Sequence, residues 1–208
     1  MKRITKTKPE PLVAFVCTGN RFRSPLAAAR FRDLCGSVPF EIASYGTTAY
    51  AGSKPMGTAI QAAAELGLVL DSHRPTVLRH GELRGALLVI GFEFQHVAAA
   101  VIDGGASQSV SFTLPELCAL LDPPIRVEGR TLEERLPAIV EGAHQIRQRE
   151  RGHHPPAIPD PSTASPRVAA GIAAEIDSLV TRLHAQLAGQ RRRESDDGGN
   201  AAQQIRVV

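Results

Sequence analysis

Cysteine is scarce in this chain: 208 residues contain three, Cys17, Cys35 and Cys118. An odd number without close pairing excludes a disulfide framework and favours a reducing compartment. Long hydrophobic runs are also missing. No stretch is long enough to span a bilayer, and the apolar run behind the basic N-terminus is too short for the core of a signal peptide. We therefore expect a cytoplasmic protein that does not bind membranes.

A strong charge of one sign is likewise absent. The chain has 24 Lys and Arg against 21 Asp and Glu, a net charge of +3. This mildly basic balance suits an anionic substrate and does not argue for nucleic acid. Part of the basic excess lies in residues 1–10, which we expect to form a flexible arm. Residues 190–208 are polar and predict a disordered tail, which leaves one domain over residues 11–189.

Metal-binding patterns are weak too. The adjacent His153 and His154 lack further Cys, His or Asp residues at the spacing of metal ligands, so we expect no metal and no cofactor.

What the chain does have is concentrated between Leu12 and Pro25. The apolar run over residues 12–16 predicts a strand buried on both faces, and it leads directly into Cys17. Ser24-Pro25 then opens an alanine-rich helical pattern that continues to Cys35. Within this strand, loop and helix, the pattern Cys-(five residues)-Arg-Ser is the signature of a phosphatase loop that uses a cysteine.

The spacing has a chemical reason. Backbone N–H groups of a loop that feeds a helix N-terminus form an anion cradle, and a thiol placed there is pushed towards its nucleophilic thiolate form. Arg23 can grip two phosphate oxygens with its planar guanidinium group, and the hydroxyl of Ser24 can reach the thiolate. Gly19 and Asn20 tolerate the left-handed backbone that the curl requires. The remaining phosphate-binding positions are Thr18, Arg21 and Phe22.

The segment Cys-Thr-Gly-Asn-x-x-Arg-Ser-Pro resembles the low-molecular-weight protein tyrosine phosphatase family, whose fold also hosts arsenate reductases. Most members have a second cysteine immediately before the arginine, where this chain has Phe22. The resemblance implies that Ser44, in Ser-Tyr-Gly-Thr, and His73 brace the loop asparagine. A strand-end turn and a surface histidine are the alternatives for these two residues.

The reaction also needs a general acid to protonate the leaving group. The family has an Asp-Pro on a late loop before the last helix, and Asp160-Pro161 matches it, in the setting Ile-x-Asp-Pro. Asp122-Pro123 is the rival pair, and an ordinary turn is the alternative for either. Tyrosine often follows this Asp-Pro in members that act on phosphotyrosine, whereas Ser162 and Thr163 follow here.

Strands alternate with helices from Leu12 to Leu187, which predicts an α/β fold: a three-layer α/β/α sandwich around a mainly parallel four-stranded sheet. The resemblance implies a phosphomonoester hydrolase with Cys17 as nucleophile, a phosphocysteine intermediate, and a phosphotyrosine protein or a small phosphomonoester as substrate. Two other functions are possible for this fold. An arsenate reductase would need further redox cysteines within reach, and the other alternative is a weak phosphate-binding or scaffold protein. We expect a monomer or a weak homodimer.

Overall fold

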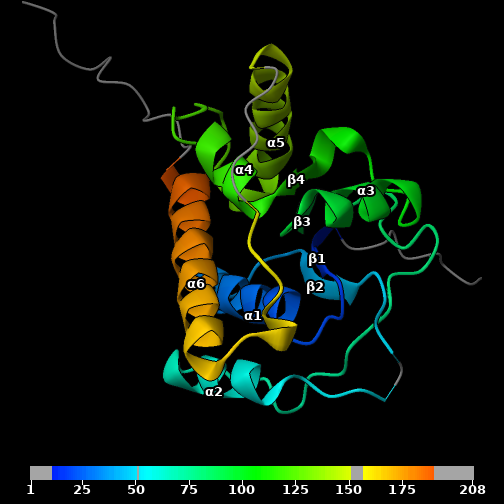
Figure 1. Cartoon of the computed structure of the whole chain (residues 1–208). Coiled ribbons are helices and arrows are strands. Elements are labelled where there is room, and N and C mark those ends of the chain that lie inside the picture. The colour runs from blue at the N-terminus through cyan, green and yellow to red at the C-terminus, as the bar shows by residue number, and fades with distance from the viewer. Residues whose placement is uncertain (1–10, 51, 151–156, 190–208) are drawn as a thin grey trace, which may run out of the picture.

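The computed structural model describes residues 11–50, 52–150 and 157–189, and it has the predicted α/β architecture (Figure 1). The sheet has four strands in the order β2-β1-β3-β4, and every neighbouring pair is parallel. The strands are β1 (Leu12–Cys17), β2 (Glu41–Gly46), β3 (Leu88–Gly91) and β4 (Ser111–Thr113). The helices are α1 (Arg23–Cys35), α2 (Gly57–Glu65), α3 (Phe94–Ile102), α4 (Leu114–Leu120), α5 (Leu132–Arg149) and α6 (Pro166–Gly189), with 3-10 turns η1 (Gln108–Val110) and η2 (Pro161–Thr163).

The alternation of side chains along β1 divides the core into two layers. Val13 and Phe15 belong to the larger apolar cluster, together with residues of α1, α4, α5 and α6. Ala14 and Val16 belong to the smaller cluster, with residues of α3 and of the segment that precedes β3. All four side chains are fully buried. The three-layer sandwich predicted from the sequence is confirmed, with β1 at its centre.

One boundary differs in detail from the prediction: helix α1 begins at Arg23, one residue before the expected Ser24. Helix α5 continues through Pro137, although a proline in a helix interior usually kinks or breaks the helix. Leu136, Ile139 and Val140 are buried in the core there, and this packing outweighs the hydrogen bond that proline cannot make.

The carboxyl end of β1 meets that of β2 in a tight approach. A Cβ atom on Gly46 would lie 2.8 Å from the carbonyl oxygen of Thr18 and 2.9 Å from the backbone nitrogen of Asn20. Only glycine allows the two strand ends to come this close, and the loop after β1 is packed against β2 as a result. No helix in the described part of the chain is long and apolar enough to cross a bilayer.

Candidate active site

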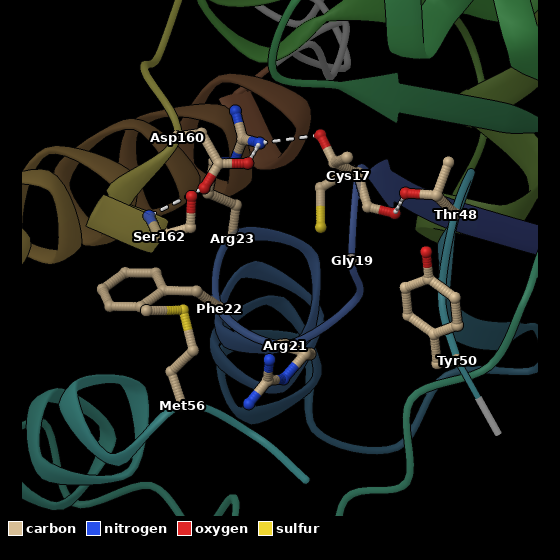
Figure 2. A pocket seen from close by; sticks show the side chains of 11 residues that line it. Cys17, Gly19, Arg21, Phe22, Arg23, Thr48, Tyr50, Met56, Asp160 and Ser162 are labelled. Atoms are coloured by element: carbon tan, nitrogen blue, oxygen red, sulfur yellow. Dashed lines mark hydrogen bonds and ion pairs between the residues drawn. The ribbon is translucent and has the colours of Figure 1, made fainter. Parts of the chain in front are cut away.

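A cavity of about 190 Å³ opens at the carboxyl end of β1 (Figure 2). It lies where parallel α/β sheets usually bind their ligands, outside the ends of the strands. Its walls come from the loop after β1, the segment after β2 and the loop before α6: Cys17, Thr18, Gly19, Arg21, Phe22, Arg23, Thr48, Tyr50, Met56, Asp160 and Ser162. The cavity therefore brings the predicted nucleophile, arginine and acid together.

The thiol of Cys17 lies on this cavity in a polar setting, although its residue is only 2% exposed. The backbone N–H of Asn20 donates to its sulfur over 3.3 Å, and Sγ lies 3.0 Å from the hydroxyl of Ser24. Both contacts can stabilise negative charge on the sulfur, because each partner can donate a hydrogen.

Asn20 ties the loop to the rest of the protein. It is the non-glycine residue with positive φ, 52°, among those described, so of the two residues that tolerate a left-handed backbone it is Asn20, and not Gly19, that adopts it. The Asn20 side-chain amide donates to the hydroxyls of Ser24 and Ser44, over 2.8 and 2.9 Å. Its backbone oxygen lies 2.9 Å from Nε2 of His73. Ser44 and His73 thus both form hydrogen-bond contacts with the loop asparagine, Asn20.

Arg21 and Phe22 occupy opposite environments on the loop. Arg21 is exposed at the rim of the cavity, and its Nε donates to the carbonyl oxygen of Lys54 over 2.7 Å. Phe22 is 3% exposed and belongs to the large apolar core, so an aromatic ring fills the position before the arginine. Phe22 and Met56 lie next to each other on the wall of the cavity (Figure 2).

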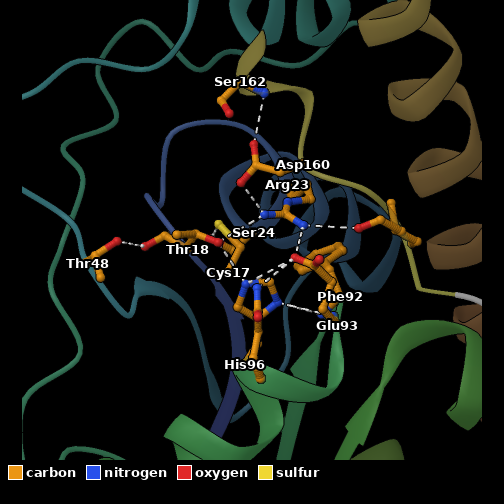
Figure 3. A network of polar contacts seen from close by, with 12 residues as sticks. Cys17, Thr18, Arg23, Ser24, Thr48, Phe92, Glu93, His96, Asp160 and Ser162 are labelled. Atoms are coloured by element: carbon orange, nitrogen blue, oxygen red, sulfur yellow. Dashed lines mark hydrogen bonds and ion pairs between the residues drawn. The ribbon is translucent and has the colours of Figure 1, made fainter. Parts of the chain in front are cut away.

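Arg23 is 1% exposed, and both terminal nitrogens of its guanidinium group have two acceptors (Figure 3). Nη1 donates to the Glu93 carboxylate over 2.6 Å and to the carbonyl oxygen of Ile158 over 3.0 Å. Nη2 donates to the hydroxyl of Thr18 over 3.1 Å and to the carboxylate of Asp160 over 2.5 Å. Such charge-assisted bonds fix the plane of the guanidinium group.

Asp160 arrives from the loop before α6, 137 residues from Arg23 in the sequence. Its second carboxylate oxygen accepts from the backbone N–H of Ser162 over 2.9 Å and so begins the η2 turn. The side chain is 38% exposed, which leaves it accessible from the cavity. Asp122, the rival, lies elsewhere and forms an ion pair with Arg182 of α6.

Two polar residues of the site were not predicted as such, Glu93 and His96, which lie three residues apart just after β3. His96 is 1% exposed. Its Nδ1 accepts from the backbone N–H of Glu93 over 3.1 Å, and its Nε2 lies 3.0 Å from the hydroxyl of Thr18. Burial, followed by the charge of Arg23, lowers the pKa of His96 from 6.5 to about 4. An acid and a histidine directly after a buried strand are the signal that could have identified them, because β3 pairs with β1.

The other two thiols lie outside the cavity lining. Burial raises the pKa of Cys35 to about 11 and that of Cys118 to about 12, so both are protonated at neutral pH. Within residues 11–50, 52–150 and 157–189, no three His, Cys, Asp or Glu side chains gather into a group that could hold a metal ion. His153 and His154 lie outside the described residues.

Comparison with known proteins places this geometry in a family. A curated relative, the protein-arginine-phosphatase of Bacillus subtilis, is 28% identical over 149 residues, which cover 67% of this chain and 99% of the relative. Three solved structures share the fold over 85–86% of this chain and 99% of theirs. They are a YwlE mutant from Bacillus subtilis (TM-score 0.62, 23% identity), the tyrosine phosphatase Wzb from Escherichia coli K30 (0.61, 18%) and a low molecular weight protein tyrosine phosphatase from T. tengcongensis (0.59, 25%).

The family model for low molecular weight phosphotyrosine protein phosphatases matches residues 12–115, half of the chain. That span includes the whole loop from Cys17 to Ser24 and stops before Asp160. The chain belongs to the low molecular weight phosphotyrosine protein phosphatase family, and so to the phosphatases.

Proposed function

We propose that this protein hydrolyses phosphomonoesters on proteins, with Cys17 as nucleophile, Arg23 as the phosphate-binding cation and Asp160 as general acid. The observation that carries the proposal is the convergence of these three side chains on one cavity, with Arg23 in direct contact with Asp160. Neither a metal nor a cofactor enters the reaction.

The first step transfers the phosphoryl group to the enzyme. The Cys17 thiolate attacks phosphorus, an S–P bond forms, and the bond from phosphorus to the leaving oxygen breaks. Asp160 gives its proton to that oxygen, so the product leaves as an alcohol or a phenol. The backbone amides of the loop and the guanidinium group of Arg23 stabilise the charge on the equatorial oxygens.

The second step releases phosphate. Asp160, now ionised, takes a proton from a water molecule, and that water attacks the phosphorus of the phosphocysteine. The S–P bond breaks, and its electron pair returns to Cys17 as the thiolate. The loop returns to its starting state, with the proton back on Asp160.

The contact between Arg23 and Asp160 supports a specific order of events. The phosphate dianion competes with the Asp160 carboxylate for Nη2 of Arg23, because both are anions that seek the same buried cation. Substrate binding thereby releases the Asp160 carboxyl group from Arg23 and leaves it beside the leaving group, where the first step needs it.

The rim of the cavity supports an aryl phosphate. Tyr50, 78% exposed, and the apolar walls formed by Phe22 and Met56 offer surfaces on which a phenyl ring can pack. The exposed charge of Arg21 is compatible with the negative charge of a phosphotyrosine segment. We therefore propose phosphotyrosine proteins as the first substrate class, in a reducing compartment where Cys17 stays a thiol, with the protein acting as a monomer or a weak homodimer.

Phosphoarginine proteins are the second candidate, favoured by the curated relative that is named a protein-arginine-phosphatase. Arg21 disfavours this substrate class, because its positive charge at the rim would repel the guanidinium group of a phosphoarginine. Small phosphate esters, such as sugar phosphates, would leave the apolar walls without a partner.

The test measures kcat/KM for matched peptides that carry phosphotyrosine, phosphoarginine or phosphoserine, and for a sugar phosphate. The proposal expects phosphotyrosine to be the best substrate, and Arg21→Ala to improve phosphoarginine hydrolysis relative to phosphotyrosine. Cys17→Ser should abolish turnover but still bind vanadate, because the cradle is made mainly of backbone N–H groups. Substantial turnover by Cys17→Ser would refute the nucleophile, and a higher kcat/KM for phosphoarginine would replace the first substrate class by the second.

A further inference from the structure

His96 is a buried titratable group that the proposed reaction does not use. It lies in the first turn of α3, and its ring contacts the backbone on one side and the phosphate-binding loop on the other (Figure 3). Nδ1 faces two backbone N–H groups, those of Phe92 at 3.4 Å and Glu93 at 3.1 Å. Nε2 faces the hydroxyl of Thr18 at 3.0 Å.

The partners of the ring assign its tautomer. A backbone N–H can only donate, so Nδ1 must accept and cannot itself hold a hydrogen. A neutral imidazole has one hydrogen, which is then on Nε2 and points at Thr18. The ring is kept neutral by the same surroundings, since burial and the nearby Arg23 both disfavour its charged form, against the weaker effects of Glu93 and Asp160.

This tautomer determines what the Thr18 hydroxyl does. Its oxygen accepts one hydrogen from Nε2 of His96 and a second from Nη2 of Arg23, which uses both lone pairs. The hydrogen of Thr18 is therefore given to neither neighbour. Because Thr18 lines the cavity, that hydrogen is available to a bound phosphoryl oxygen.

We infer that His96 is a positioning residue of the phosphatase reaction: as the Nε2–H tautomer it fixes the Thr18 hydroxyl, which aims Arg23 and keeps its own hydrogen for the phosphoryl group. The inference rests on the proposed function, since it assumes that Arg23 binds the transferred phosphoryl group. It predicts an effect on the rate of the chemical step, because a misaimed guanidinium group loses contacts that tighten in the transition state.

Three substitutions separate this role from a structural one. His96→Asn keeps an acceptor where Nδ1 lies but is too short to reach Thr18. His96→Gln keeps a donor where Nε2 lies but loses the ring acceptor for the backbone. Thr18→Val removes the hydroxyl from the other side of the same contact at nearly constant shape. His144→Asn, on α5 and outside the cavity lining, is the matched control.

The measurements are kcat and KM on an aryl phosphate together with thermal unfolding of each variant. We expect kcat to fall about tenfold in His96→Asn and in Thr18→Val, with KM within about twofold, since one lost hydrogen bond to an aligned group is worth roughly a factor of ten. His96→Gln should stay within about threefold of the wild-type kcat although it unfolds at a lower temperature than His96→Asn. The double variant Thr18→Val/His96→Asn should be no slower than Thr18→Val alone.

Full activity of His96→Asn, or losses in the double variant that multiply, would overturn the inference. If His96→Asn does not fold, Thr18→Val and His96→Gln still test it, and full activity of Thr18→Val has the same meaning. Failure of the proposed function is distinguishable, because it appears as a wild type that does not hydrolyse phosphate esters. In that case vanadate binding, measured by calorimetry, tests the positioning of Arg23: it should be about tenfold weaker in His96→Asn and Thr18→Val and restored in His96→Gln.

Discussion

The chain builds two clusters from the same three residue types, a cysteine, an arginine and the aspartate of an Asp-Pro pair, and only one of them lies on the cavity. The first is Cys17, Arg23 and Asp160; the second is Cys118, Arg182 and Asp122, at the end of α4 against α6. In both clusters the arginine and the aspartate form an ion pair. Because the residue types are the same, the differences between the two clusters show which surroundings a phosphatase site needs.

The two sulfurs differ in the direction of their hydrogen bonds. Cys17 Sγ accepts from the backbone N–H of Asn20, an arrangement that stabilises a thiolate. Cys118 Sγ donates to the carbonyl oxygen of Leu179 over 3.4 Å, an arrangement that requires the thiol. Burial raises the pKa of Cys118 to about 12, although Arg182 acts in the opposite direction. At Cys118 a nearby arginine is thus not enough to offset the effect of burial on the thiol.

The two arginines differ in burial. The Arg23 side chain is 1% exposed and the Arg182 side chain 45%. A buried guanidinium group has lost its water and must be paired with other groups. An anionic substrate can therefore replace one of these partners, and water does not screen the new ion pair. An exposed ion pair is screened by water and contributes little. Four predictions test this comparison.

The largest expected effect is on the thiols. Hydrogen peroxide should abolish activity irreversibly by oxidising Cys17 beyond the sulfenic acid, because Phe22 precedes the arginine and the cavity lining offers no second thiol to form a protective disulfide. Cys118 should remain a thiol under the same treatment. Mass spectrometry after mild oxidation distinguishes the products. A disulfide from Cys17 to Cys35 or Cys118 as the main product would contradict this prediction and revive the arsenate reductase alternative.

The second-largest difference is expected between the kcat losses caused by substituting the two arginines. Arg23→Lys should lower kcat by about 10³-fold or more, because a lysine cannot hold two phosphate oxygens and replaces a transition-state contact of the kind worth 10³–10⁵. Arg182→Lys should leave kcat within about twofold, since an exposed ion pair contributes only about 0–1 kcal/mol. Steady-state kinetics on one aryl phosphate measures both. Similar losses in the two variants would mean that burial does not distinguish the clusters.

The two Asp-Pro pairs give a smaller, substrate-dependent difference. Asp160→Asn should slow alkyl phosphate hydrolysis by about 10²–10⁴-fold, the usual contribution of a general acid. An activated aryl phosphate should be affected less, because its phenolate leaves without a proton. Asp122→Asn should change neither rate. If instead Asp122→Asn shows the dependence on leaving group, the acid lies on the other loop.

The smallest effect is on stability. His96 lies beside the first cluster, where it contacts Thr18, whereas the described contacts of the second cluster include no histidine. Its pKa is about 4 in the folded protein, below its ordinary 6.5, so the unfolded chain binds the proton more readily. The free energy of unfolding should therefore fall by roughly 2–3 kcal/mol between pH 6.5 and pH 4.

Urea unfolding at a series of pH values measures this slope in the wild type, in His96→Asn and in the control His144→Asn. The slope should be smaller in His96→Asn and unchanged in the control. An equal slope in all three proteins would mean that His96 does not contribute.

Much of the fold could be read from local patterns. The buried strand before Cys17, the helix opened by Ser24-Pro25 and the long apolar stripe of α6 are each determined by neighbours in the sequence. Residue-level details needed the structure. It selects Asn20 over Gly19 for the left-handed conformation, and the packing of Leu136 and Ile139 maintains α5 through Pro137.

By itself the sequence determined the nucleophile loop, because a strand, five loop residues and a helix are consecutive and place Arg23 six residues after Cys17. Only the tertiary structure decided which groups surround that arginine. Glu93, 70 residues away, reaches Arg23 because it follows β3, whose carboxyl end lies beside that of β1 at one edge of the sheet. Asp160, 137 residues away, follows no strand; its loop is held there by the Ile158 backbone, which donates to the carbonyl oxygen of Phe92 and accepts from Arg23. The role of His96 depended on the same edge: its spacing from Glu93 is visible in the sequence, but its contact with Thr18 exists only where β3 lies beside β1.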